Sequence, residues 1–99
     1  MELKIQSIKF DATEKLKVYI QKKVDKLEKK SDAVLGVEVI LKVIKPESAD
    51  NKQADIKVMV PQAELFATKI SNSFEQSVDE AIEAVEKQLE KYKEKKSPK

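Results

Sequence analysis

Two long segments of the chain place apolar residues at the spacing of an amphipathic helix. Thr13 or Asp11 can cap the first helix, which should end near residues 30–32. Its apolar positions are Leu16, Tyr19, Ile20, Val24 and Leu27. The second helix begins after Ser73, because residues 73–76 match a capping box, and it continues for about five turns. Its apolar positions are Phe74, Val78, Ala81, Ile82, Val85, Leu89 and Tyr92.

Four other segments have the alternation or the β-branched residues of strands. Residues 2–10 alternate, but the phase slips between Ile5 and Ile8, which predicts a bulge near residues 6–7. Residues 34–45 form a β-branched run that Pro46 ends, and residues 54–60 alternate strictly. A turn over residues 61–63 leads into a strand over 64–70, with Leu65 and Ala67 in the core. Residues 46–53 are polar and are expected to form a mobile loop.

The predicted fold class is α+β with element order β-α-β-β-β-α. The first crossover should be right-handed, so the first two strands run parallel, and the last three strands form an antiparallel meander. Both helices are amphipathic and need one apolar surface, so they should pack on the same face of a four-stranded mixed sheet. We expect a single domain over residues 1–95 and a frayed basic tail over residues 96–99.

Composition argues against catalysis and against a bound cofactor. The 99 residues include no Cys and no His, so thiol chemistry and the commonest general base and metal ligand are missing. A single glycine, Gly36, excludes a glycine-rich phosphate loop. We expect no enzyme activity, no cofactor, no metal site and no small-molecule substrate. No segment has the ~20 apolar residues of a membrane span, so we expect no membrane partner and a soluble, cytoplasmic protein.

Charge is sorted on both helices although the formal net charge is only +2. On the first helix, one flank carries Lys15, Lys22, Lys26 and Lys29, and the opposite flank carries Glu14, Asp25 and Glu28. On the second helix, a lysine stripe runs opposite the core, through Lys87, Lys91 and Lys95. An acidic band separates this stripe from the core and comprises Glu75, Asp79, Glu83, Glu86, Glu90 and Glu94. Two interpretations stay open: ordinary solvated helices, or two basic ridges that track phosphates.

A second candidate surface is apolar and lies on the sheet face away from the helices. Phe66, Ile70, Ile40 and Ile44 are expected there. Such a patch would serve as a dimer or partner surface, or a loop or the tail would cover it. Tyr19 and Tyr92 lie within the apolar helix stripes, which favours packing over base stacking.

Three local strings, in this order and spacing, carry a family resemblance over about residues 1–95. They are Asp25-Lys-Leu-Glu-Lys29, Val39-Ile-Leu-Lys-Val43 and Val85-Glu-Lys-Gln-Leu-Glu-Lys91-Tyr-Lys93. With the order of elements, they resemble the short ribosome hibernation-promoting factors, a family that includes the ribosome-associated inhibitor proteins. The resemblance implies a fold similar to double-stranded-RNA-binding domains. It also implies binding to rRNA of the small ribosomal subunit near the decoding centre, which would block translation sterically in slowly growing or stressed cells.

The resemblance also implies which lysines bind rRNA. The family's basic positions fall on Lys26, Lys29, Lys87, Lys91 and Lys93, with Lys22 and Lys23 as neighbours, and the lysine stripe adds Lys95. The chain contains no Arg, so its phosphate contacts would be those of point charges. The chain stops after the second helix, so we expect no further domain that pairs ribosomes.

Two alternative functions remain open beside the resemblance. The same ridges would suit a binding module for another structured RNA. A small interaction protein that self-associates through the sheet face around Phe66 and Ile70 is the other alternative. We expect the free protein to be a monomer or a weak dimer.

Overall fold

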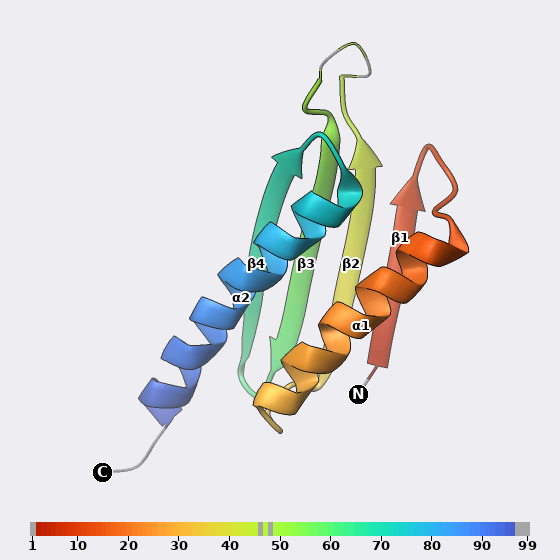
Figure 1. Ribbon diagram of the computed structural model, residues 1–99. Helices are drawn as coiled ribbons and strands as arrows, with labels where there is room; N and C mark the ends of the chain where they lie inside the picture. Colours follow the sequence, from red (N-terminus) through yellow and green to blue (C-terminus); the bar gives the residue numbers. More distant parts are fainter. Residues whose placement is uncertain (1, 46, 48, 97–99) are drawn as a thin grey trace.

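The computed structural model describes residues 2–45, 47 and 49–96, with the side chains of Lys95 and Lys96 left aside. Its elements follow the predicted order, β-α-β-β-β-α. The strands are β1 (Glu2–Ile8), β2 (Gly36–Val43), β3 (Lys52–Val60) and β4 (Ala63–Ser71). The helices are α1 (Glu14–Lys30) and α2 (Phe74–Lys96). Both helices lie side by side on one face of the sheet, as predicted (Figure 1).

The strands form one sheet in the order β1-β2-β3-β4. β1 pairs with β2 in parallel, and β2, β3 and β4 form the antiparallel meander, so the predicted topology is confirmed. The predicted bulge in β1 is wrong, because residues 2–8 pair one to one with residues 36–42. The phase slip has a simpler cause. Alternation continues without interruption, and the side chain of Ile8 lies on the sheet face opposite to that of Leu3 and Ile5.

Helix α1 begins at its predicted cap. The Oγ1 atom of Thr13 accepts a hydrogen bond from the backbone N–H of Leu16 at 3.1 Å. Of the two candidate caps, Thr13 therefore fills the role rather than Asp11. The helix ends at Lys30, and the backbone N–H of Ser31 donates to the carbonyl of Glu28.

Helix α2 begins with half of the predicted capping box. The Oγ atom of Ser73 accepts from the backbone N–H of Gln76 at 3.1 Å. The side chain of Gln76 does not reach back to Ser73 and instead donates to Glu80, one turn along the helix. A second anchor is the buried Ser77, whose hydroxyl donates to the carbonyl of Lys52 at 2.6 Å. Because the carbonyl belongs to β3, this bond fixes the start of α2 over the sheet.

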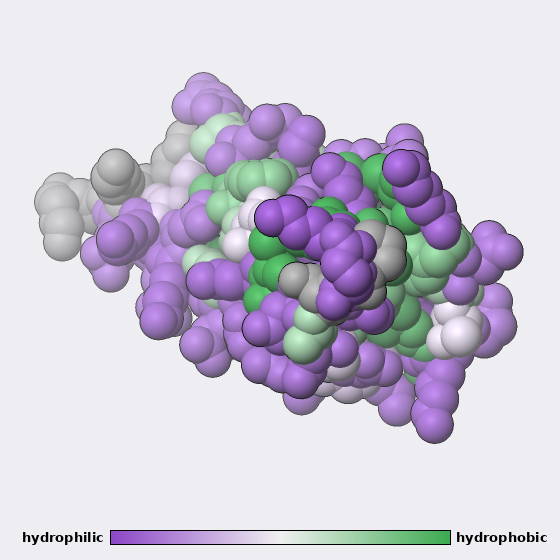
Figure 2. Space-filling view, turned by 90° about the horizontal axis from the view of Figure 1, so that it is seen from above, coloured by the Kyte–Doolittle hydropathy of each residue, from purple (hydrophilic) through white to green (hydrophobic). Residues whose placement is uncertain are grey.

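The core is a single apolar layer between the helix pair and the sheet. Every strand alternates, so one face supplies side chains to this layer and the other face meets solvent. Seen from above, hydrophilic residues form most of the outline of the molecule (Figure 2). The core residues predicted on β4, Leu65 and Ala67, are buried, which confirms that prediction. The largest fully buried side chains are those of Ile20, Leu27, Leu41, Ile56 and Leu89.

The turn between β3 and β4 holds the far end of α2. Pro61 and Gln62 form the turn, and Gln62 takes a positive φ of 68°, the conformation that a type II turn requires at its third residue. The hydroxyl of Tyr92 donates to the carbonyl of Pro61 at 2.8 Å. Tyr92 thus packs against the core and also ties α2 to the hairpin.

The connection between β2 and β3 has the predicted length but lies two residues earlier in the chain, because β2 ends at Val43 rather than near residue 45. β3 begins at Lys52 rather than at residue 54, and the backbone N–H of Ile44 donates to the carbonyl of Asn51 at 2.8 Å. Pro46 and Ser48, which belong to the predicted loop, lie outside the described residues. At the chain end, α2 continues to Lys96, and residues 97–99 of the predicted tail also lie outside the described residues.

Two isoleucines of the β3–β4 hairpin test whether burial on the helix side of the sheet contributes more to stability than the outer side does. Ile56 is fully buried and Ile70 is 46% exposed. We expect Ile56→Ala to lower the free energy of unfolding by about 2–5 kcal/mol, and Ile56→Val by about 1 kcal/mol. Ile70→Ala should cost about 1 kcal/mol or less, because it removes little buried area. Urea denaturation of the three variants measures these differences, and equal losses from the two alanine variants would contradict the one-sided core.

Candidate nucleic-acid interface

The flanks of α1 and α2 that face each other are complementary in charge. The Nζ atom of Lys23 lies 3.2 Å from Oδ1 of Asp79, and Nζ of Lys30 lies 3.4 Å from Oε2 of Glu86. A groove of about 300 Å³ runs between the helices. It is lined by Lys23, Lys26, Asp79, Ile82, Glu83 and Glu86. Three residues of the acidic band, Asp79, Glu83 and Glu86, therefore line the groove that faces α1. The other members of the band are exposed.

Tyr19 is held at the start of this groove. Its hydroxyl is 2.8 Å from Oδ1 and 2.7 Å from Oδ2 of Asp79. The hydrogen bond to the Asp79 carboxylate, followed by burial and by the negative charges of Asp79 and Glu75, raises the pKa of Tyr19 to about 12. The ammonium of Lys23 lies over the same ring, 5.3 Å from its centroid. Tyr19 thus serves packing and helix–helix contact, in line with the interpretation that the sequence favoured.

The solvent-exposed side of α1 carries a first row of lysines, which we call the α1 ridge: Lys15, Lys22, Lys26 and Lys29. Lys26 also lines the groove between the helices. All four side chains are exposed. Among the described side chains, no carboxylate lies within ion-pair distance of them. Because i, i+4 and i+7 positions share one side of a helix, Lys22, Lys26 and Lys29 lie along one line. Their charges are available to a ligand in solvent.

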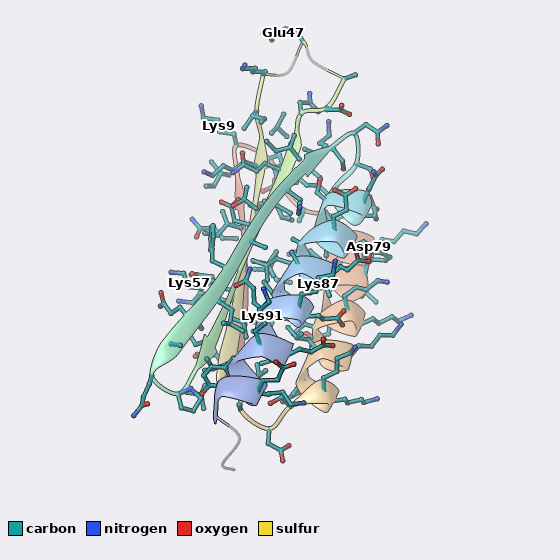
Figure 3. All side chains as sticks on the ribbon, turned by 90° about the vertical axis from the view of Figure 1, so that its left-hand side faces the viewer. Lys9, Glu47, Lys57, Asp79, Lys87 and Lys91 are labelled. Atoms are coloured by element: carbon teal, nitrogen blue, oxygen red, sulfur yellow. The ribbon has the colours of Figure 1, made fainter. Side chains whose placement is uncertain are left out.

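A second row, the α2 ridge, comprises Lys87 and Lys91. Both side chains are exposed and, within the described part of the chain, neither forms an ion pair. Figure 3 shows the two lysines along α2, with Asp79 nearer the start of that helix and Lys57 on the opposite side of the sheet. Lys91 lines a shallow depression with Ala63 and Leu65, so this ridge lies toward β4 and away from α1. The predicted side-chain position of Lys95 lies outside the described residues.

Two of the predicted site lysines have partners within the protein. Lys23 is half buried and paired with Asp79, as described above. Lys93 donates to the backbone carbonyl of Lys30 at 2.9 Å. Since that carbonyl belongs to the last residue of α1, the Lys93 charge stabilises the negative end of the α1 dipole. These two lysines position the helices, and their charges are less available than those of the ridges.

The structure therefore separates the predicted lysines into two ridges with an acidic band between them. Helical phase predicted the composition of each band, because it depends on one helix only. It did not show that the acidic band would face Lys23 and Lys30 across the groove. One feature of the sequence could have indicated this contact. Tyr19 and Lys23 lie one turn apart on the side of α1 nearest the core, where a neighbouring helix can reach them. No group of three side chains suited to a metal ion occurs among the described residues.

The fold has counterparts among solved structures. A ribosomal subunit interface protein from Coxiella burnetii superposes with a TM-score of 0.84 at 24% identity, over 94% of this chain and 98% of that chain. The N-terminal domain of Protein Y from Thermus thermophilus superposes with a TM-score of 0.79 at 20% identity, over 93% and 99% of the two chains. At these identities the likeness shows the fold. No curated protein matches the sequence significantly.

The family match identifies the class of protein. Residues 3–97 fit the family described as Sigma 54 modulation protein / S30EA ribosomal protein, a class of non-catalytic, ribosome-associated regulators. The chain belongs to this family of ribosome hibernation and subunit-interface proteins. The resemblance found in the sequence is therefore confirmed. Within the described residues, neither helix has an apolar stretch that would cross a bilayer.

The bond between Tyr19 and Asp79 predicts an unusual titration. The chain has two tyrosines, so in a Tyr92→Phe background the ultraviolet absorbance of tyrosinate reports on Tyr19 alone. We expect a midpoint near pH 12, and Asp79→Asn should move it down toward about 10, the ordinary value. Because the folded pKa is the higher one, the bond stabilises the protein fully below about pH 10, and this contribution is lost as the pH rises to about 12.

Glu83→Gln is the matched control for that titration. Glu83 lines the same groove one turn along α2, and no hydrogen bond to Tyr19 involves it. The Glu83→Gln variant should keep the high midpoint. A midpoint that fails to move in Asp79→Asn would show that Asp79 is not the partner of Tyr19 in solution.

Proposed function

We propose that this protein is a ribosome hibernation factor that binds rRNA of the small subunit near the decoding centre and blocks translation by occupying that space. The observation that carries the proposal is the family match over residues 3–97. The two rows of exposed lysines on the helix pair support it, because they supply the cationic surface that rRNA binding needs. The mechanism is steric exclusion, so it involves no cofactor and no group transfer.

The arrangement of charge suits two separate stretches of phosphate backbone. Neighbouring helices pack about 8–10 Å apart, and the two ridges lie on either side of an acidic groove. Phosphates would be repelled from Glu83 and Glu86 in the groove and attracted to the ridges that flank it. Since ammonium groups act as point charges, recognition would depend on the shape of the RNA and the positions of its phosphates.

The lysines contribute unequally in this proposal. Lys22, Lys26 and Lys29 on α1, with Lys87 and Lys91 on α2, contact rRNA directly, and we assign the same role to Lys95 from its spacing in the sequence. Lys23 and Lys93 act mainly by holding the helices in place, because each already has a partner within the protein. We propose that the protein acts in the cytoplasm, where it would meet ribosomes, and that it acts during stress and stationary phase. We propose a monomer or weak dimer in the free state.

Reversal of charge on both ridges tests the proposed surface. We expect the variant with Lys26→Glu, Lys87→Glu and Lys91→Glu to lose roughly 100-fold or more in affinity for small subunits, because three charge-assisted contacts become repulsive. Co-sedimentation through sucrose gradients measures the binding. Thermal unfolding followed by circular dichroism confirms that the variant is folded.

A control with the same change in net charge uses lysines on the sheet face away from the helices. Lys4, Lys42 and Lys57 lie there, and Lys57 lies on that side of the sheet in Figure 3. Reversing these three lysines should leave co-sedimentation within a few-fold of the unmodified protein. If both triple variants bind like the parent, or if both fail equally, the helix ridges are not the binding surface.

The salt dependence of binding counts the phosphate contacts. Lys26→Ala, Lys87→Ala and Lys91→Ala together should reduce the slope of log affinity against log salt by roughly 2 to 3, since each lost contact accounts for about 0.7–0.9. Fluorescence anisotropy with labelled protein, titrated with small subunits at several salt concentrations, gives the slope. An unchanged slope would mean that these lysines do not meet phosphates.

The same ridges also fit a different structured RNA, and competition separates the two functions. Labelled protein bound to small subunits is challenged with an excess of a generic RNA duplex. The proposal requires that the subunits retain the protein. Displacement by the duplex at comparable nucleotide concentration would favour the general RNA-binding module.

A further inference from the structure

β4 lies at one edge of the sheet and therefore presents main-chain groups that no neighbouring strand satisfies. In an edge strand, every second residue directs its backbone N–H and C=O away from the neighbouring strand, toward the open side of the sheet. In β4 the outward residues are those of even number. Ala63 and Val60 pair across the hairpin, and the main-chain groups of Phe66 meet α2 rather than β3. The outward main-chain groups of β4 thus belong to Glu64, Phe66, Thr68 and Ile70.

Gln88 of α2 occupies the middle of this edge with its side-chain amide. The backbone N–H of Phe66 donates to Oε1 of Gln88 at 3.1 Å, and Nε2 of Gln88 donates to the carbonyl of Phe66 at 2.7 Å. A carboxamide has the same donor and acceptor as a peptide group. The two bonds therefore reproduce the pair that a residue of a neighbouring antiparallel strand would form.

Both sides of this edge carry apolar side chains. On the helix side, Ala63, Leu65 and Tyr92, together with Lys91, line a depression of about 340 Å³ beside Gln88. On the other side, Phe66 and Ile70 are 50% and 46% exposed. A strand added here would bury apolar side chains on both of its faces. β4 itself is such a segment, with Leu65 and Ala67 on one face and Phe66 and Ile70 on the other.

We infer that the Gln88 amide is an edge latch, which keeps β4 from pairing antiparallel with β4 of a second copy of this chain. A dimer of this kind is symmetric, because the same edge serves both copies. With the latch closed, the central position of the edge is filled and the two strands have no continuous row of groups to pair. This inference concerns self-association and does not depend on ribosome binding.

Removal of the latch tests the inference directly. We expect Gln88→Ala to increase the association constant for dimerisation at least tenfold over the unmodified protein, measured by sedimentation equilibrium. Gln76→Ala is the matched control, because Gln76 is another exposed glutamine of α2 and its side chain binds only Glu80 among the described residues. This control should behave like the unmodified protein. A folded Gln88→Ala variant that associates no more than the control would overturn the inference.

A second substitution shows whether the dimer uses the edge. The N–H of Thr68 points outward, so Thr68→Pro removes an edge donor without removing a bond to β3. The double variant Gln88→Ala, Thr68→Pro should return to the association constant of the unmodified protein. If it dimerises as strongly as Gln88→Ala, then the copies meet elsewhere and the edge assignment is wrong.

Hydrogen exchange tests the latch without any substitution. In the unmodified monomer, the amide of Phe66 should exchange at least tenfold more slowly than the amide of Thr68 on the same edge, measured by NMR. Equal rates for the two amides would show that Gln88 does not hold Phe66 in solution, and this result would stand even if Gln88→Ala failed to fold.

Discussion

The constraint behind this structure is that two amphipathic helices share one apolar sheet face. Burial of that face supplies most of the stabilisation, and it leaves α1 and α2 no choice but to lie flank to flank. The charged side chains on the two facing flanks must then be complementary and must not repel each other. Lys23 with Asp79, and Lys30 with Glu86, meet this requirement. Exposed pairs contribute about 0–1 kcal/mol each, so their main effect is on which sides of the helices face each other.

This arrangement also decides what the surface offers to a ligand. Asp79, Glu83 and Glu86 of α2 line the groove between the helices, where they meet Lys23 and Lys26. The lysines of both ridges are exposed to solvent. A formal net charge of +2 conceals this distribution. Electrostatic binding depends on where charges lie, and a nearly neutral protein can still carry a surface suited to phosphates. The proposed function depends on this separation more than on the total number of lysines.

The second exposed feature of the fold is the β4 edge of the sheet, and side chains of α2 contact it as well. Tyr92 ties this helix to the β3–β4 turn, and Gln88 reaches the middle of β4. Natural sheets commonly protect their edges with charges, bulges or covering segments. Here one side chain of the neighbouring helix performs that role. The same helix thus carries the α2 ridge on one side and, on the adjacent side, the Gln88 contact with β4.

The sequence by itself determined the elements, their order, the region where each helix begins and nearly all of the core. These follow from local periodicity and capping, which act within one element or between chain neighbours. The prediction of a bulge in β1 was wrong, because the change in alternation at Ile8 only means that this side chain lies on the outer face of the sheet. Only the tertiary structure decided that Lys23 is paired with Asp79, that Lys26 has no ion pair among the described side chains, and that Gln88 meets Phe66. The two partners of each such contact are many residues apart, so the contact depends on how the helices pack against each other and the sheet. No pattern within a single segment contains that information.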